Sequence, residues 1–175
     1  MIGLIRNFID FVVYRTIKKY NCIKIKSLNP NYYDKDTLLL HGMMQLLVDY
    51  VEVELATISN NTMLYKAIQF LPWWIRPTIR SRELGLQQIK EIKKSLDYPR
   101  KQVEVITKIE KIYLWWKDTY PNRIPPEDIF KNIVEENYNL NDNLVKEYIK
   151  IEKDYYDEET LMLKQLIEIR EHLWT

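Results

Sequence analysis

Residues 34–57 decide the fold and read DKDTLLLHGMMQLLVDYVEVELAT. At about 100° per residue, apolar side chains fall on two opposite sides of a helix built from this stretch. The side chains on one side are Met43, Leu46, Leu47, Tyr50 and Val53. Those on the other side are Leu38, Met44, Val48, Val51 and Leu55. Because a helix that is apolar all round is buried, we predict that residues 34–57 form the central helix of the protein.

Most of the remaining chain also has helical signals. Ser81 is a suitable N-cap for a helix that ends near Leu96, and Pro99 suits the first turn of the next helix. A short helix is expected over 127–136, and a long one follows the capping residues 139–142 and ends near Trp174. Apolar and basic residues alternate at 22–26, and this alternation allows one short edge strand. The predicted fold is therefore all-α, a compact helical bundle around the buried helix at 34–57.

Length and loop pattern predict one helical domain spanning residues 1–175. A chain of 175 residues is long enough for a sizeable core, and no repeat or flexible linker interrupts it. Residues 1–26 form a basic amphipathic segment within that domain, without the basic start and cleavage site of a signal peptide. Cys22 is the only cysteine, which excludes an intrachain disulfide and cysteine-based zinc sites.

The predicted central helix also carries polar side chains, which are unusual in a buried helix. His41, Gln45, Asp49 and Glu52 fall within an arc of about 80°, whereas Glu54 points elsewhere. Buried charges need ion pairs, hydrogen bonds or a changed protonation state. One interpretation is a structural network, in which Asp49 and Glu52 pair with Arg or Lys from neighbouring helices and His41 is a hydrogen-bonded core histidine.

The second interpretation is a metal or acid–base site on the same helix face. His41, Asp49 and Glu52 would supply ligands, and a second helix would add Asp154, Asp157 or Glu158. Oxygen ligands of this kind suit Mg²⁺ or Mn²⁺. This alternative predicts a metal-dependent hydrolase of phosphate esters or nucleotides. The first interpretation requires no cofactor.

Two tryptophan pairs stand out in a chain of this length. Together with nearby arginines, these tryptophans form a candidate binding surface. Its residues are Trp73, Trp74, Arg76, Trp115, Trp116 and Arg123. Large aromatic side chains usually pack in cores. The same residue types also form the anchors of protein-binding surfaces or stack on single-stranded nucleic acid. Core packing, a protein-binding surface and a stacking platform therefore remain three alternatives here.

The overall charge is almost neutral, but it is unevenly distributed. The chain has 26 Lys and Arg against 25 Asp and Glu. Residues 1–26 carry six basic side chains and one acidic one, whereas residues 127–175 carry six basic and thirteen acidic ones. Basic side chains in residues 1–26 suggest a contact with nucleic acid or with a membrane surface. They are Arg15, Lys18, Lys19, Lys24 and Lys26. No uninterrupted apolar stretch is long enough for a transmembrane helix.

Several segments resemble a group of small tailed-bacteriophage proteins that have no assigned activity. The segments are 36–41 DTLLLH, 46–54 LLVDYVEVE, 112–116 IYLWW with 121–123 PNR, 156–163 YDEETLML and 169–175 IREHLWT. That group has a His before Leu-Val-Asp-Phe-Val-Glu, a Trp-Trp pair before Pro-Asn-Arg, and a final Leu-Trp-Thr. The resemblance covers most of residues 34–175, with Tyr50 in place of the usual Phe. It implies a phage origin and a setting in the host cytoplasm.

We therefore expect a phage-encoded accessory protein that binds a host or phage protein and is not an enzyme. Host takeover, defence against host immunity and a minor place in the virion are the roles that fit such a protein. The paired tryptophans, the uneven charge and the lack of a recognised catalytic motif favour this interpretation. The hydrolase with His41, Asp49 and Glu52 is the first alternative. Nucleic-acid binding through the basic N-terminal segment is the second.

Overall fold

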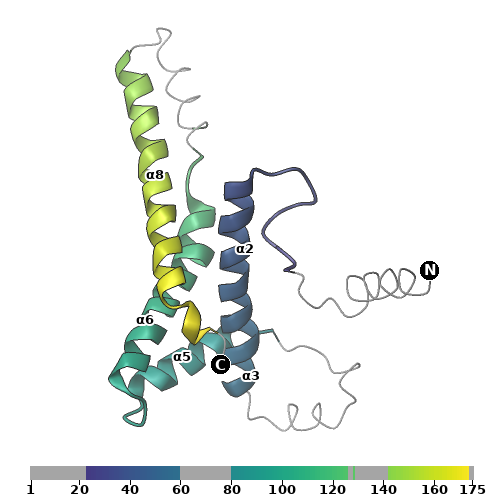
Figure 1. Ribbon diagram of the computed structural model, residues 1–175, viewed down its shortest axis with the longest axis vertical. Coiled ribbons are helices and arrows are strands. Elements are labelled where there is room, and N and C mark those ends of the chain that lie inside the picture. Colours follow the sequence, from purple (N-terminus) through teal and green to yellow (C-terminus); the bar gives the residue numbers. More distant parts are fainter. Residues whose placement is uncertain (1–22, 60–79, 126–127, 129–141, 174–175) are drawn as a thin grey trace, which may run out of the picture. The chain divides into compact units, whose positions relative to one another are not determined.

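The computed structural model describes residues 23–59, 80–125, 128 and 142–173. The chain divides into two compact units, Met1–Gln45 and Leu46–Thr175, and we describe each by itself. The single domain expected from the short loops stays a prediction. All regular elements of the described residues are helical, so the expected all-α fold is confirmed (Figure 1).

The first unit contains an irregular segment and the beginning of helix α2 (Lys35–Asp49). The edge strand suggested for 22–26 is not formed in its described part, because residues 23–25 have no regular structure. Instead of pairing with a strand, the Lys26 backbone N–H donates to the Gln45 side chain at 3.0 Å. The Ser27 hydroxyl lies 2.8 Å from Nδ1 of His41, which is buried.

The predicted helix over 34–57 is present, but its geometry changes along its length. It consists of α2, a π-helix named η2 (Tyr50–Leu55) and α3 (Ala56–Ser59). From Leu40 onward the predicted burial is confirmed in part, with Met44, Leu47 and Val51 fully enclosed. Three side chains of the other predicted side are only half-buried, namely Met43, Leu46 and Val53. Leu38 is an exception, since the first turn of α2 is largely exposed to solvent. Burial therefore begins one turn later than the apolar pattern indicated.

Two further helices of the second unit begin at the predicted positions. Helix α5 (Arg82–Lys94) is capped by Ser81, whose hydroxyl accepts from the Leu84 N–H at 3.3 Å. Helix α6 (Arg100–Leu114) begins directly after Pro99. It continues into a second π-helix, η3 (Trp115–Thr119), and a 3₁₀ turn, η4 (Tyr120–Asn122). Helix α5 packs against η2, α3 and α6, and its inward side chains include Ile89 and Ile92.

The last helix is α8 (Asp142–Glu168), followed by a 3₁₀ turn, η5 (Arg170–His172). It runs beside α6 and contributes Met162 and Leu166 to the core (Figure 1). The helix predicted for 127–136 lies outside the described residues except at Asp128, and most of the basic segment 1–26 also lies outside them. No helix in the described parts of the chain combines the length and apolar character needed to cross a membrane.

Candidate functional site

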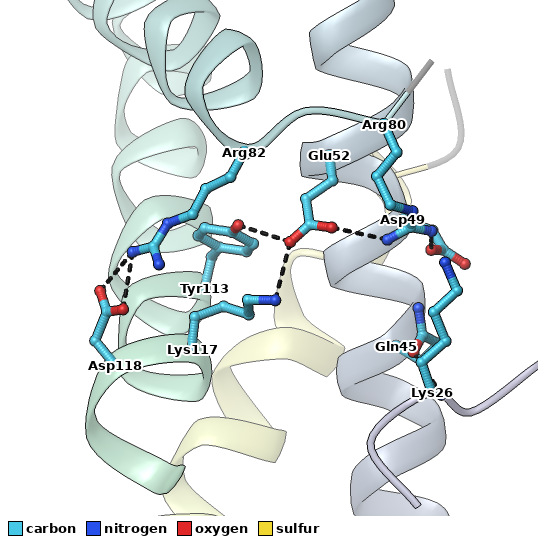
Figure 2. A network of polar contacts seen from close by, with 9 residues as sticks. All are labelled: Lys26, Gln45, Asp49, Glu52, Arg80, Arg82, Tyr113, Lys117 and Asp118. Carbon is cyan, nitrogen blue, oxygen red and sulfur yellow. Dashed lines mark hydrogen bonds and ion pairs between the residues drawn. The ribbon is translucent and has the colours of Figure 1, made fainter. Parts of the chain in front are cut away.

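Glu52 is the centre of a polar network in the second unit (Figure 2). Its Oε1 accepts a hydrogen bond from the Tyr113 hydroxyl at 2.9 Å and lies 3.1 Å from the Lys117 ammonium. Its Oε2 accepts from the Arg80 guanidinium at 2.8 Å, and Arg80 also pairs with Asp49. Two carboxylates therefore face two cations, and both oxygens of the buried Glu52 are engaged.

The π-helix η2 positions Glu52 and also changes its backbone contacts. In a regular α-helix the Ala56 N–H would donate to the carbonyl oxygen of Glu52. Here it donates to Val53 instead, and the Glu52 carbonyl accepts from the Ser81 N–H at 2.9 Å. This bond fixes the start of α5 beside η2. Because Arg80 immediately precedes Ser81, the same bond places the guanidinium next to the Glu52 carboxylate.

The surroundings keep Glu52 ionised and Tyr113 protonated. Burial by itself raises the pKa of Glu52, but the hydrogen bonds from Arg80, Lys117 and Tyr113 outweigh it, so the pKa lies below its ordinary value. Burial is the main cause that raises the pKa of Tyr113 well above that of a free phenol, and the hydrogen bond to Glu52 raises it further. A carboxylate held in this way is a poor proton acceptor, and the network acts as a clamp between η2, α5, α6 and η3.

The other residues of the predicted metal site lie in different surroundings. His41 belongs to the first unit, where burial lowers the pKa of its imidazole. Asp154 and Asp157 are exposed on α8, whereas Glu158 pairs with Arg123. No group of three or more metal-suited side chains was found among the residues that the structure describes. For Asp49 and Glu52 the structure shows the ion-pair arrangement, with Arg80 and Lys117 as partners.

A second polar cluster surrounds Arg123. Its guanidinium pairs with Glu158 and, at 2.9 Å, with Glu159, both on α8. It also lies about 5 Å from the ring centres of Trp115, Tyr120 and Tyr155, at 5.1, 5.1 and 4.7 Å. The Trp115 indole N–H donates to Glu158 at 2.8 Å. This cluster joins α8 to the η3–η4 segment through charge-assisted and cation–π contacts.

The structure brings together half of the predicted aromatic binding surface. Trp115 and Trp116 are buried, with ring centres 6.1 Å apart, and Trp116 stacks on Tyr120 at 4.5 Å. These indoles and Arg123 therefore face the interior, where they have little surface to offer a partner. Trp73, Trp74 and Arg76 lie outside the described residues.

Four exposed apolar side chains lie on one side of α8 instead, with the exposed Glu152 beside them. They are Val145, Ile149, Tyr156 and Ile167, which are 39%, 55%, 64% and 45% exposed, respectively. At about 100° per residue, these four positions fall within an arc of about 40°. They span about 33 Å of the helix at 1.5 Å per residue. We call these four residues the α8 face.

Sequence reasoning identified Asp49 and Glu52 but missed their partners. Arg80, Tyr113 and Lys117 are 28, 61 and 65 residues from Glu52 in the chain, and no spacing rule connects them to it. The only local signal was the position of Arg80 next to a helix cap. The α8 face was also missed, although Val145, Ile149 and Tyr156 follow helical spacing.

The comparisons with known proteins add no relative. No protein-family model, curated protein or solved structure matches the chain.

Proposed function

We propose that this is a phage-encoded accessory protein that acts by binding a host or phage protein through the α8 face. The single observation that carries the proposal is the exposure of Val145, Ile149, Tyr156 and Ile167 on one side of a 27-residue helix. Apolar side chains gathered on one face of an exposed helix are typical of a helix that docks in a groove or pairs with another helix. A host-takeover factor, an anti-defence factor or a minor virion protein would each use such a contact.

The geometry gives less support to the hydrolase alternative. A divalent cation needs carboxylate oxygens that are open to it. Both oxygens of Glu52 are instead occupied by Arg80, Lys117 and Tyr113. Positive charge already occupies the space where the cation would bind, and this favours a binding protein over a metal-dependent enzyme.

The test compares two apolar-to-charged substitutions on the same helix. Ile149→Asp places a charge at the centre of the α8 face. Leu161→Asp is the matched control, because Leu161 is also exposed on α8 but lies about 120° around the helix from Ile149. A partner recovered from infected cells is identified, purified and titrated against both variants by calorimetry.

We expect Ile149→Asp to weaken the complex at least tenfold, because burial of a carboxylate against an apolar surface is unfavourable. Leu161→Asp should bind within about twofold of the unchanged protein. Equal affinities for both variants, or a photocrosslinker at position 149 that forms no adduct with the partner, would contradict the proposal. Circular dichroism of each variant confirms that the helices are intact.

A further inference from the structure

We propose that a cavity beside Tyr50 in the second unit binds a small amphipathic carboxylate, a molecule with an apolar body and one carboxylate group. The cavity lies between the start of η2, the first half of α6 and the turn η5, and has a volume of about 330 Å³. Ligand pockets in proteins range from about 300 to 1,000 Å³, so this one suits a small molecule. The inference is independent of the α8 face.

The inner wall of the cavity is apolar. Val105, Ile106 and Ile109 line it, and Ile106 and Ile109 are buried in the core of the unit. These three side chains come from consecutive inward positions of α6, which makes the wall part of a rigid helix. An alkyl chain or an aromatic ring placed against this wall would be removed from water, and burial of apolar area is favourable.

The polar side chains of the cavity favour an anion. Lys101 and His172 line it, and none of the described residues that line it is acidic. Lys101 is exposed and has no ion pair within the described part of the chain, so its ammonium is available to a ligand. An apolar wall combined with a cationic side chain matches a ligand whose charged end is negative.

Tyr50 supplies the second, independent observation. The residue is 8% exposed and lines the cavity, and its hydroxyl has no hydrogen-bond partner among the described residues but remains in contact with solvent. A hydroxyl that the protein does not enclose can donate a hydrogen bond to a ligand. Burial, with the nearby Glu54, raises the pKa of Tyr50, so its hydroxyl is a protonated donor at neutral pH. A carboxylate oxygen in the cavity would satisfy this donor.

The experiment uses octanoate as the probe and octylammonium as its cationic counterpart of equal chain length. The full-length protein, labelled at the Ile and Val methyl groups, is titrated with each probe and followed by NMR. The variants are Lys101→Glu and Tyr50→Phe. Lys90→Glu is the matched control, since it makes the same charge change at an exposed site that does not line the cavity.

We expect octanoate to shift the methyl signals of Val105, Ile106 and Ile109 in a saturable way. Octylammonium should bind about tenfold more weakly or not at all. Lys101→Glu should weaken octanoate binding about tenfold, and Tyr50→Phe about fivefold, which corresponds to the loss of one hydrogen bond. Lys90→Glu should leave the affinity unchanged.

Three outcomes would overturn the inference. The first is the absence of saturable shifts at these methyl groups up to millimolar octanoate. The second is equal affinity for octanoate and octylammonium, which would show an apolar site without charge selection. The third is an equal loss of affinity in Lys90→Glu and Lys101→Glu, which would reflect net charge and not this cavity.

Discussion

At the scale of single residues, Glu52 shows how a carboxylate remains ionised inside a helical unit. Removing it from water is unfavourable, and two cations and a phenol compensate for that loss. Each donor comes from a different part of the unit, so this one side chain links four segments. The same contacts that stabilise its charge remove it from acid–base chemistry.

Gly85 is a second residue whose identity the structure requires. A Cβ atom at this position would collide with the backbone carbonyl of Val51, because α5 and η2 approach closely there. A carbonyl cannot rotate away as a side chain can, so the two helices would have to separate. We predict that Gly85→Ala lowers the free energy of unfolding by about 2 kcal/mol, measured by urea denaturation.

Gly42 provides the control for that measurement. A Cβ atom there would lie 3.7 Å from Cδ1 of Ile25, an ordinary van der Waals distance. Ala is favoured over Gly inside a helix by up to about 1 kcal/mol. Gly42→Ala should therefore leave stability unchanged or raise it. If the Gly85→Ala protein were as stable as the Gly42→Ala protein, α5 and η2 could move apart without a loss of stability, which would contradict the prediction.

At the scale of elements, the π-helices η2 and η3 carry most of the polar chemistry. Glu52 lies in the first, and Lys117 and the two buried tryptophans lie in the second. π-Helical segments are rare and occur frequently at functional sites. In this protein the change in hydrogen bonding at η2 leaves the Glu52 carbonyl able to accept the bond from Ser81.

The attachment of α8 gives the second stability prediction. Arg123→Ala removes the cation that Glu158 and Glu159 share, and burial already raises the pKa of Glu159. The Arg123 side chain is 10% exposed, so its loss leaves two partly buried carboxylates without a partner. We expect a loss of about 2–3 kcal/mol of stability and faster amide hydrogen exchange along α8.

Arg82→Ala is the matched control for Arg123→Ala. Arg82 pairs with Asp118 at 2.7 Å, but the two side chains are 37% and 49% exposed. Ion pairs this open to water contribute less than about 1 kcal/mol. Hydrogen exchange in α8 should therefore be unaffected by Arg82→Ala. If both arginine variants loosened α8 to the same degree, the Arg123 cluster would not be the specific attachment.

At the scale of the whole molecule, Glu52 should shape how stability depends on pH. Its pKa is lower in the folded protein than its ordinary value of 4.5, so the folded state favours the ionised form. That contribution is fully present above pH 4.5 and is lost as the pH falls through the lower, folded pKa. Glu54 and Glu159, whose pKa values are raised, contribute in the opposite direction.

Glu52→Gln isolates this contribution from those of the other carboxylates. Near pH 7 it should reduce stability by about 2 kcal/mol, because Arg80 and Lys117 lose their shared negative partner. The difference from the unchanged protein should shrink as the pH falls from 5 toward 3. Denaturation at a series of pH values measures it, and a difference that stays constant over this range would contradict the role of Glu52.

The sequence alone predicted the parts of the fold that depend on local patterns. The apolar periodicity of 34–57, the Ser81 cap and Pro99 each act within a few residues, and each marks a helix that the structure contains. The same local patterns suggested an edge strand near 22–26, and no strand forms in the described part of that range, residues 23–26. A strand requires a neighbouring strand to pair with, whereas the Lys26 backbone N–H donates to the Gln45 side chain instead.

Only the tertiary structure decided what surrounds each functional side chain. The donors to Glu52 come from 28 to 65 residues away, and their meeting depends on how α5, α6 and η3 lie against η2. Packing also decided that Trp115 and Trp116 are buried while the α8 face and the cavity beside Tyr50 are open. Helical periodicity specifies which residues share a face, whereas contact with another element determines whether that face is covered.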